Sequence, residues 1–215
     1  FTILDNVVVN ENTTGFQGHS SVASDSASDF VIVWQGENIS GDTYGVAGRL
    51  YEDDGTTISS EFTVNPTTSD VHRSPSVAKS PDGSISVAWV GYNGTDFDIY
   101  AQRFTAAAVA SGSEFVVNST TSGHQDNVQV EISSEGTEAF VWDRYTSDAL
   151  RTDLYAQLSS SNNSAFGTET QVNNTTSLYQ QLPAIAWVGT DEDLSAAWQS
   201  GDRNTTSSED SDDYA

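Results

Sequence analysis

The chain has 215 residues, no cysteine and no methionine, and its 31 acidic against seven basic residues give a formal net charge of −24. Without cysteine there is no disulfide framework and no thiol chemistry. So acidic a surface excludes nucleic acid and anionic membrane surfaces as partners, because phosphate groups are bound by basic residues.

The chain opens on an apolar β-type run, Phe1–Asn10, which ends in the dipeptide Val-Asn. The same dipeptide returns at Asn65, Asn118 and Asn173, at intervals of 55, 53 and 55 residues. Tryptophan recurs in step, at intervals of 55, 53 and 56 residues, at Trp34, Trp89, Trp142 and Trp198. Two markers with one period indicate four copies of a single structural unit.

The second copy contains four short β-type runs. They are residues 75–78, residues 85–89 after a Pro-Asp-Gly turn, residues 98–104 and residues 114–117. No segment shows sustained helical periodicity, and no apolar run reaches the roughly 18 residues of a membrane-spanning helix. Repeats of four strands favour an all-β fold, a four-bladed β-propeller of four-stranded antiparallel blades.

We therefore expect one propeller domain over residues 1–215. Its parts are a strand at 1–10, blades at 11–65, 66–118 and 119–173, and an incomplete blade at 174–215. The strand at 1–10 would complete the last blade and close the ring, which protects sheet edges. The alternative is an open array whose repeats continue in a larger protein.

The second repeat also resembles a known family. Its Pro75-Ser76-Val77-Ala78, Val87-Ala88-Trp89, Tyr100–Phe104 and Glu114–Asn118 segments are similar to a propeller-like repeat of large secreted and cell-surface proteins of bacteria and archaea. His72 departs from the Gln of that pattern. The resemblance implies a secreted protein or one on the extracellular surface, and it implies no particular activity.

Glycosylation sequons, Asn-x-Ser/Thr, are dense in the chain. They lie at Asn12, Asn38, Asn93, Asn118, Asn162, Asn173, Asn174 and Asn204. The repeat places them in loops, so we expect covalent N-glycans on some of them if the protein passes through a glycosylating pathway.

The four repeat tryptophans are expected in the core between blades, with a sugar-stacking platform as the alternative. Acidic clusters favour a solvated surface, and the best metal candidate is a calcium site at Asp210, Asp212 and Asp213. His19, His72 and His124 lack the fixed spacing of a transition-metal site. No other cofactor is expected.

Catalytic motifs are absent from the sequence, including the phosphate loop and the nucleophile elbow. Paired carboxylates of a glycosidase would be sought among acidic residues that depart from the repeat. These are Glu131, Glu138, Asp143 and Asp148.

Taken together, the sequence predicts a non-enzymatic structural or adhesive protein, a subunit that assembles with itself into a surface fibre or layer. The first alternative is a carbohydrate-binding propeller module, and the second is a glycosidase-like propeller enzyme.

Overall fold

The computed structural model describes residues 8–25, 29–39, 41–66, 71–145, 152–160, 167–176, 178–188 and 193–201. Every regular element in these residues is a β-strand, and neighbouring strands pair antiparallel in four separate sheets. Three sheets have four strands and the last has two described strands. Within the same residues no helix is long and apolar enough to cross a membrane.

The strands of each sheet follow chain order, and we call the four sheets blades 1 to 4. Blade 1 consists of β1 (Gln17–Ser24), β2 (Phe30–Glu37), β3 (Tyr44–Tyr51) and β4 (Phe62–Thr63). Blade 2 consists of β5 (His72–Lys79), β6 (Ile85–Tyr92), β7 (Phe97–Phe104) and β8 (Ala110–Val116). Blade 3 consists of β9 (Gln125–Ile132), β10 (Thr137–Tyr145), β11 (Thr152–Ser160) and β12 (Thr170–Gln171). Blade 4 consists of β13 (Tyr179–Val188) and β14 (Asp193–Gly201).

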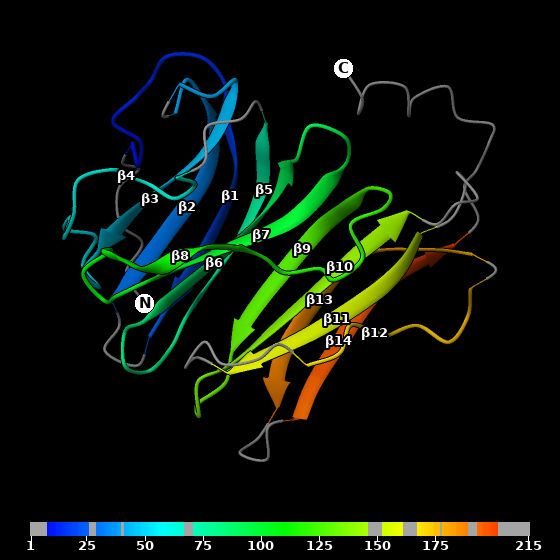
Figure 1. The fold of residues 1–215 in the computed structure, drawn as a ribbon. Helices are drawn as coiled ribbons and strands as arrows, with labels where there is room; N and C mark the ends of the chain where they lie inside the picture. The colour runs from blue at the N-terminus through cyan, green and yellow to red at the C-terminus, as the bar shows by residue number, and fades with distance from the viewer. Residues whose placement is uncertain are drawn as a thin grey trace.

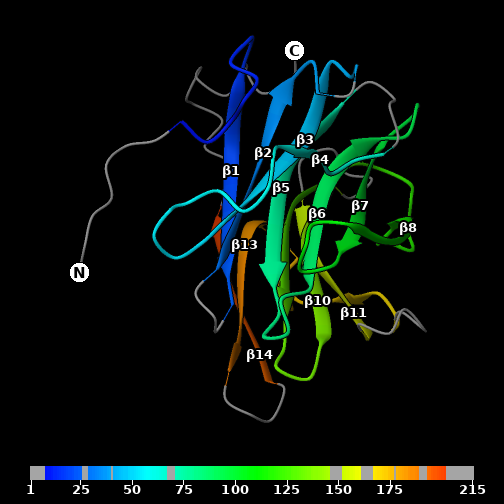
Figure 2. The same ribbon diagram turned by 90° about the vertical axis from the view of Figure 1, so that its left-hand side faces the viewer.

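The blades stand side by side around an arc (Figure 1). The first strand of each blade is innermost, so β1 packs on β5, β5 on β9 and β9 on β13. Figure 2 shows β1, β5 and β13 running lengthwise along the molecule. This radial repetition of antiparallel sheets is a β-propeller, and the predicted fold class is confirmed.

The apolar core lies between successive blades. Alternating side chains of β2 and β3 meet those of β5, β6 and β7 in one cluster, which includes Trp89 and Leu50. A second cluster joins β6 and β7 to β9 and β10, with Trp142 and Phe140 fully buried. Each blade therefore buries its faces against its neighbours, as a stacked repeat must.

The two ends of the arc expose surface that is buried elsewhere. Val22 of β1 is 64% exposed and Trp198 of β14 is 38% exposed, whereas their counterparts Val130 and Trp142 are 3% and 0% exposed. Val9, from the expected closing strand, contacts the blade 1 cluster around Trp34. Residues 1–7 of that strand lie outside the described residues.

Candidate active site on the inner strands

Each innermost strand bends at one residue with positive φ. The bend residues are His19, Ser74, Asn127 and Leu182, with φ between 48° and 54°. The pairing register shifts at each of these places, so every one is a β-bulge. Non-glycine residues in this conformation are strained by roughly 1–3 kcal/mol, and such strain gathers at functional sites.

In blades 1 and 3 the residue after the repeat tryptophan supports the bulge of the next blade. Gln35 accepts a hydrogen bond from the Ser74 backbone N–H, at 3.0 Å between Oε1 and N. In blade 3 the corresponding residue is Asp143, whose Oδ2 accepts from the Leu182 N–H at 3.3 Å. One copy of this contact therefore uses a carboxyl group where another uses an amide.

Asp143 is a buried acid with few compensating contacts. It is 1% exposed, and Asn127 donates from Nδ2 to its Oδ2 at 2.8 Å. Among the described residues its buried Oδ1 has no hydrogen-bond partner. Burial raises the pKa of Asp143 to about 7, and the nearby Asp126 charge adds to the rise. The carboxyl group thus holds a proton over much of the acidic and neutral range.

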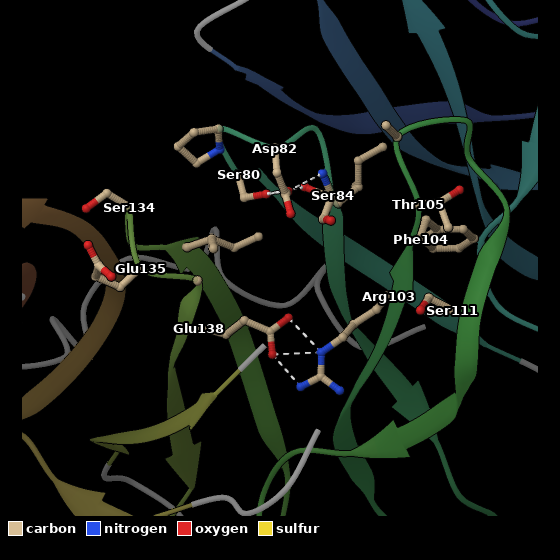
Figure 3. Close-up of a pocket in the computed structure, with 15 residues that line it drawn as sticks. Ser80, Asp82, Ser84, Arg103, Phe104, Thr105, Ser111, Ser134, Glu135 and Glu138 are labelled. Carbon is tan, nitrogen blue, oxygen red and sulfur yellow. Dashed lines mark hydrogen bonds and ion pairs between the residues drawn. The ribbon is translucent and has the colours of Figure 1, made fainter. Parts of the chain in front are cut away.

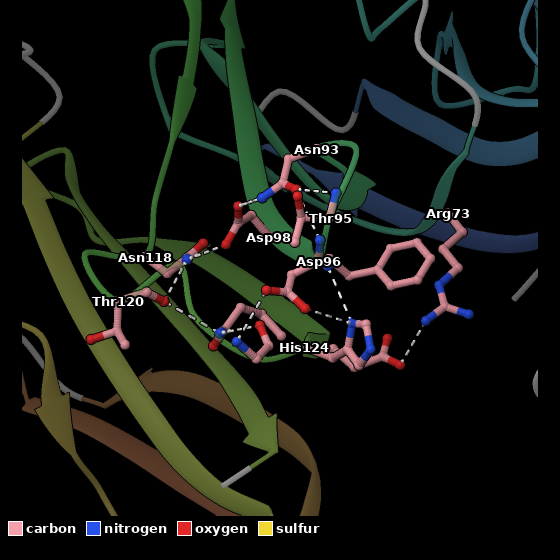
Figure 4. Close-up of polar contacts among 12 residues, drawn as sticks. Arg73, Asn93, Thr95, Asp96, Asp98, Asn118, Thr120 and His124 are labelled. Carbon is pink, nitrogen blue, oxygen red and sulfur yellow. Dashed lines mark hydrogen bonds and ion pairs between the residues drawn. The ribbon is translucent and has the colours of Figure 1, made fainter. Parts of the chain in front are cut away.

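Asp126 faces Asp143 across the strand pair, because the two residues are direct partners in the register of β9 and β10. Its Oδ2 lies 3.0 Å from Nη2 of Arg73 on the inner strand of blade 2. Figure 4 shows Arg73 reaching toward this carboxylate beside His124. Two carboxyl groups in unlike surroundings, one buried and one ion-paired, form an arrangement used for acid–base catalysis.

Half-buried aromatic rings lie beside the ion pair. The guanidinium of Arg73 lies 4.5 Å from the centre of the Phe97 ring. His124 packs between Phe97 and Tyr145, with ring centres 5.4 Å and 6.4 Å apart. Such rings provide flat apolar faces next to charged groups, as sugar-binding sites require.

The acidic residues singled out in the sequence do not come together. Glu138 and Asp143 are five residues apart on β10, so they point to opposite faces and lie about 17 Å apart along the strand. Glu138 instead accepts from Nε of Arg103 at 2.9 Å. Burial raises the pKa of Glu131, which takes no part in the contacts around Asp126 and Asp143. Asp148 lies outside the described residues.

The repeat asparagines are structural. Oδ1 of Asn118 accepts from the Ile99 N–H at 2.7 Å, and its Nδ2 donates to Asp98 at 2.7 Å (Figure 4). Asn173 makes the matching contacts to Leu154 and Asp153. Both side chains are buried and their amide nitrogens donate hydrogen bonds within the blade, so Asn118 and Asn173 do not have the exposure that the sequence predicted for them.

The other described sequon asparagines are more exposed. Asn38, Asn93 and Asn174 are exposed, and Asn12 is half-buried. Nδ2 of Asn93 donates to Asp98 at 2.6 Å. Asn162 and Asn204 lie outside the described residues. The exposed set keeps glycosylation as an expectation for three loop positions.

The repeat tryptophans differ in burial, and all but Trp89 donate a hydrogen bond to the glutamine of their own blade. Trp34, Trp89 and Trp142 are buried, and Trp198 lies at the exposed end of the arc. Trp34 donates from Nε1 to Gln17, and Trp142 does the same to Gln125, each at 3.1 Å. His72 replaces this glutamine in blade 2, and Nε1 of Trp89 then has no acceptor in the described part of the chain.

The expected metal ligands Asp210, Asp212 and Asp213 lie outside the described ranges, so the calcium site stays a prediction. Elsewhere in the described chain no group of three or more His, Asp or Glu side chains is placed to hold an ion. His19, His72 and His124 sit on three separate blades, on β1, on β5 and before β9.

Sequence reasoning missed Arg73 and Asp126. Each directly follows the repeat column formed by His72 and Gln125, so both occupy one column of successive repeats. Opposite charges in a single column of adjacent repeats are a signal for an ion pair between blades, and that signal was available in the sequence.

No protein-family model and no curated protein sequence matches this chain. Solved structures share the fold at low identity. An endo-arabinase from Bacteroides thetaiotaomicron superposes with a TM-score of 0.60 and 14% identity, over 89% of this chain and 74% of its own. A protein of unknown function from Dyadobacter fermentans gives 0.66 and 12%, over 91% and 65%. A thermostable family-43 glycoside hydrolase gives 0.54 and 11%, over 84% and 64%.

These identities show the fold alone, and the chain spans only about two thirds of the last two structures. The fold is a glycosidase-like propeller. The prediction that the chain is not an enzyme is corrected by this finding, because it was inferred from a propeller repeat and missing motifs, and glycoside hydrolases are built on the same propeller.

Proposed function

We propose that this chain is a carbohydrate-active propeller of the glycoside hydrolase type, with its reaction centre at Asp126 and Asp143. The observation that carries the proposal is the pairing of these carboxyl groups across β9 and β10, one buried and one joined to Arg73. The fold shared with an endo-arabinase and a family-43 hydrolase supports the same class.

The pair supplies the two protonation states that glycoside hydrolysis needs. One carboxyl group must carry a proton for the leaving oxygen, and the other must be ionised to meet the positive charge that develops on the sugar. Asp143 holds the proton because burial raises its pKa to about 7. Asp126 is the ionised partner in the ion pair with Arg73.

The burial of the two carboxyl groups determines which of them a substrate meets first. Asn127 and Leu182 cover Asp143 through the hydrogen bonds to its Oδ2, whereas the Asp126 side chain is 17% exposed. A sugar that stacks on the neighbouring aromatic rings therefore meets Asp126 first. Asp126 is thus the first of the two carboxyl groups in contact with substrate.

The test is release of reducing sugar from arabinan, xylan and galactan by the full chain, compared with Asp126→Asn and Asp143→Asn. We expect hydrolysis of at least one polymer and at least a hundredfold loss in each variant, since a positioned acid–base group contributes about 10²–10⁴-fold. Proton NMR of the first product then gives the anomeric configuration.

The matched control is Asp193→Asn, an exposed aspartate at the start of β14. It should hydrolyse at the wild-type rate. Hydrolysis that persists in Asp126→Asn rules out the proposed centre, and no hydrolysis of any polymer by the unaltered chain rules out the proposed function.

A further inference from the structure

A cleft opens between blades 2 and 3 at the other end of the inner strands. Its volume is about 610 Å³, and it is bordered by the turn at residues 80–84, the turn at residues 132–136 and the adjoining parts of β7 and β8. Arg73 lies near the start of β5 and Ser80 directly after its end. The length of that strand, about 24 Å, therefore separates this cleft from Asp126 and Asp143.

An ion pair bridges the equivalent positions between blades 1 and 2. Lys79, the last residue of β5, extends its Nζ to within 2.8 Å of Asp25 Oδ2, and both side chains are almost fully buried. In the next junction the corresponding positions are Ile132, the last residue of β9, and Ser80, which follows β5. These two side chains cannot form an ion pair, so two departures from the repeat leave this junction open.

A third departure places a rigid polar group in the cleft. Glu138 occupies the repeat position of Ile85, and it is 2% exposed. Arg103 of blade 2 donates to it from Nε at 2.9 Å and from Nη2, and Nη2 also donates to Ser159 Oγ at 3.1 Å. Figure 3 shows this pair below the two turns that face one another. A buried ion pair with extra hydrogen bonds is held in one geometry.

The charge and the lining residues of the cleft limit the class of ligand that it can bind. The carboxylates of Asp82, Glu135 and Glu138 outnumber the guanidinium of Arg103 in the lining, so phosphate, sulfate and uronic acids are disfavoured. A divalent ion is not favoured either, because the described carboxylates do not gather into a metal-holding group. The remaining lining mixes serine and threonine hydroxyls with the apolar side chains of Pro81 and Ile132, which are not buried in the core.

We propose that the cleft between blades 2 and 3 binds an uncharged sugar residue of a glycan chain. A pyranose or furanose ring has hydroxyls for the serine-lined turns and an apolar face for Pro81 and Ile132. The volume lies in the range of small-molecule sites, about 300–1,000 Å³. The inference does not depend on the reaction centre, because the two places lie at opposite ends of β5 and β9.

The experiment is isothermal titration calorimetry of the full chain carrying Asp126→Asn, which prevents turnover, with arabinotriose, xylotriose, cellotriose and maltotriose. At least one trisaccharide should bind. The double substitution Ser80→Asp with Ile132→Lys copies the Asp25–Lys79 pair and should weaken that binding at least tenfold.

A second variant protects the test against misfolding. Ser111 is exposed on β8 and borders the cleft, so Ser111→Trp fills the space without touching the core. It should weaken binding at least tenfold as well, and Asp193→Asn should bind as before. Unchanged binding in the folded variants places the sugar elsewhere and overturns the proposal. Binding of spermidine or calcium in place of every trisaccharide overturns the ligand class.

Discussion

The junction between blades 1 and 2 and the junction between blades 2 and 3 are copies of one repeat with different contents. The first is bridged by Lys79 and Asp25, and its bulge at Ser74 is supported by the amide of Gln35. The second contains the Arg103–Glu138 pair, the Arg73–Asp126 pair and the open cleft. Repeated residues build the propeller, and the residues that break the repeat supply its chemistry.

The largest expected effect is a pH dependence of the unfolding free energy. The carboxyl group of Asp143 produces it, and the amide of Gln35 at the corresponding position cannot. Burial raises the pKa of Asp143 to about 7, against about 3.9 in an unfolded chain. Between these values the folded chain keeps a proton that the unfolded chain has lost. The free energy of unfolding should therefore fall as the pH rises from about 4 to about 7, by about 4 kcal/mol from this group.

Urea unfolding across that interval measures the effect, with Asp143→Asn as the comparison. The difference in unfolding free energy between the two proteins should change with pH and become level above about pH 7. A difference that stays constant from about pH 4 to about pH 8 contradicts a buried, protonated Asp143.

A smaller loss is expected when the ion pair of the second junction is broken. Glu138→Gln leaves the partly buried Arg103 without its counter-charge and should destabilise the chain by about 3 kcal/mol. Replacing both residues by leucine imitates the apolar Ile85 of the preceding blade and should restore stability to within about 1 kcal/mol. Equal losses in the single and double variants contradict this account, and urea midpoints at constant pH decide it.

The smallest effect concerns a hydrogen-bond network that the blades have in common. Asn173→Ala removes the acceptor of the buried Leu154 N–H and the donor to Asp153, which should cost about 2 kcal/mol. The adjacent exposed Asn174→Ala should change stability by less than about 0.5 kcal/mol. Asn65→Ala and Asn118→Ala should match Asn173→Ala, because the three networks are alike. Thermal unfolding of the four variants measures these losses of stability. Unequal losses among Asn65→Ala, Asn118→Ala and Asn173→Ala would show that the blades are not equivalent.

Much of the fold could be predicted from the sequence because it repeats. The Val-Asn and tryptophan columns identified four antiparallel units and their order. The same columns did not reveal burial. Asn118 and Asn173 lie in sequons, but their side chains are buried and hydrogen-bond to the adjacent strand of their own blade.

The candidate site was harder to predict because its members come from different repeats. Glu138 and Asp143 were recognised as unusual, but the contacts of Glu138 with Arg103 and of Asp126 with Arg73 depend on how one blade is placed against the next. Exposure of Trp198 and burial of Trp142 likewise follow from position in the arc, since the local sequences are alike.

The bulges of the inner strands have a consequence for assembly of the chain. Gln35 accepts the hydrogen bond from the bend at Ser74, and Asp143 accepts the one from the bend at Leu182, so these two bent strands rely on the blade before them. The repeat that begins at β5 or β13, if excised alone, would have to maintain its kink without that support. Damage to the blade that supplies the acceptor is therefore expected to reach its successor.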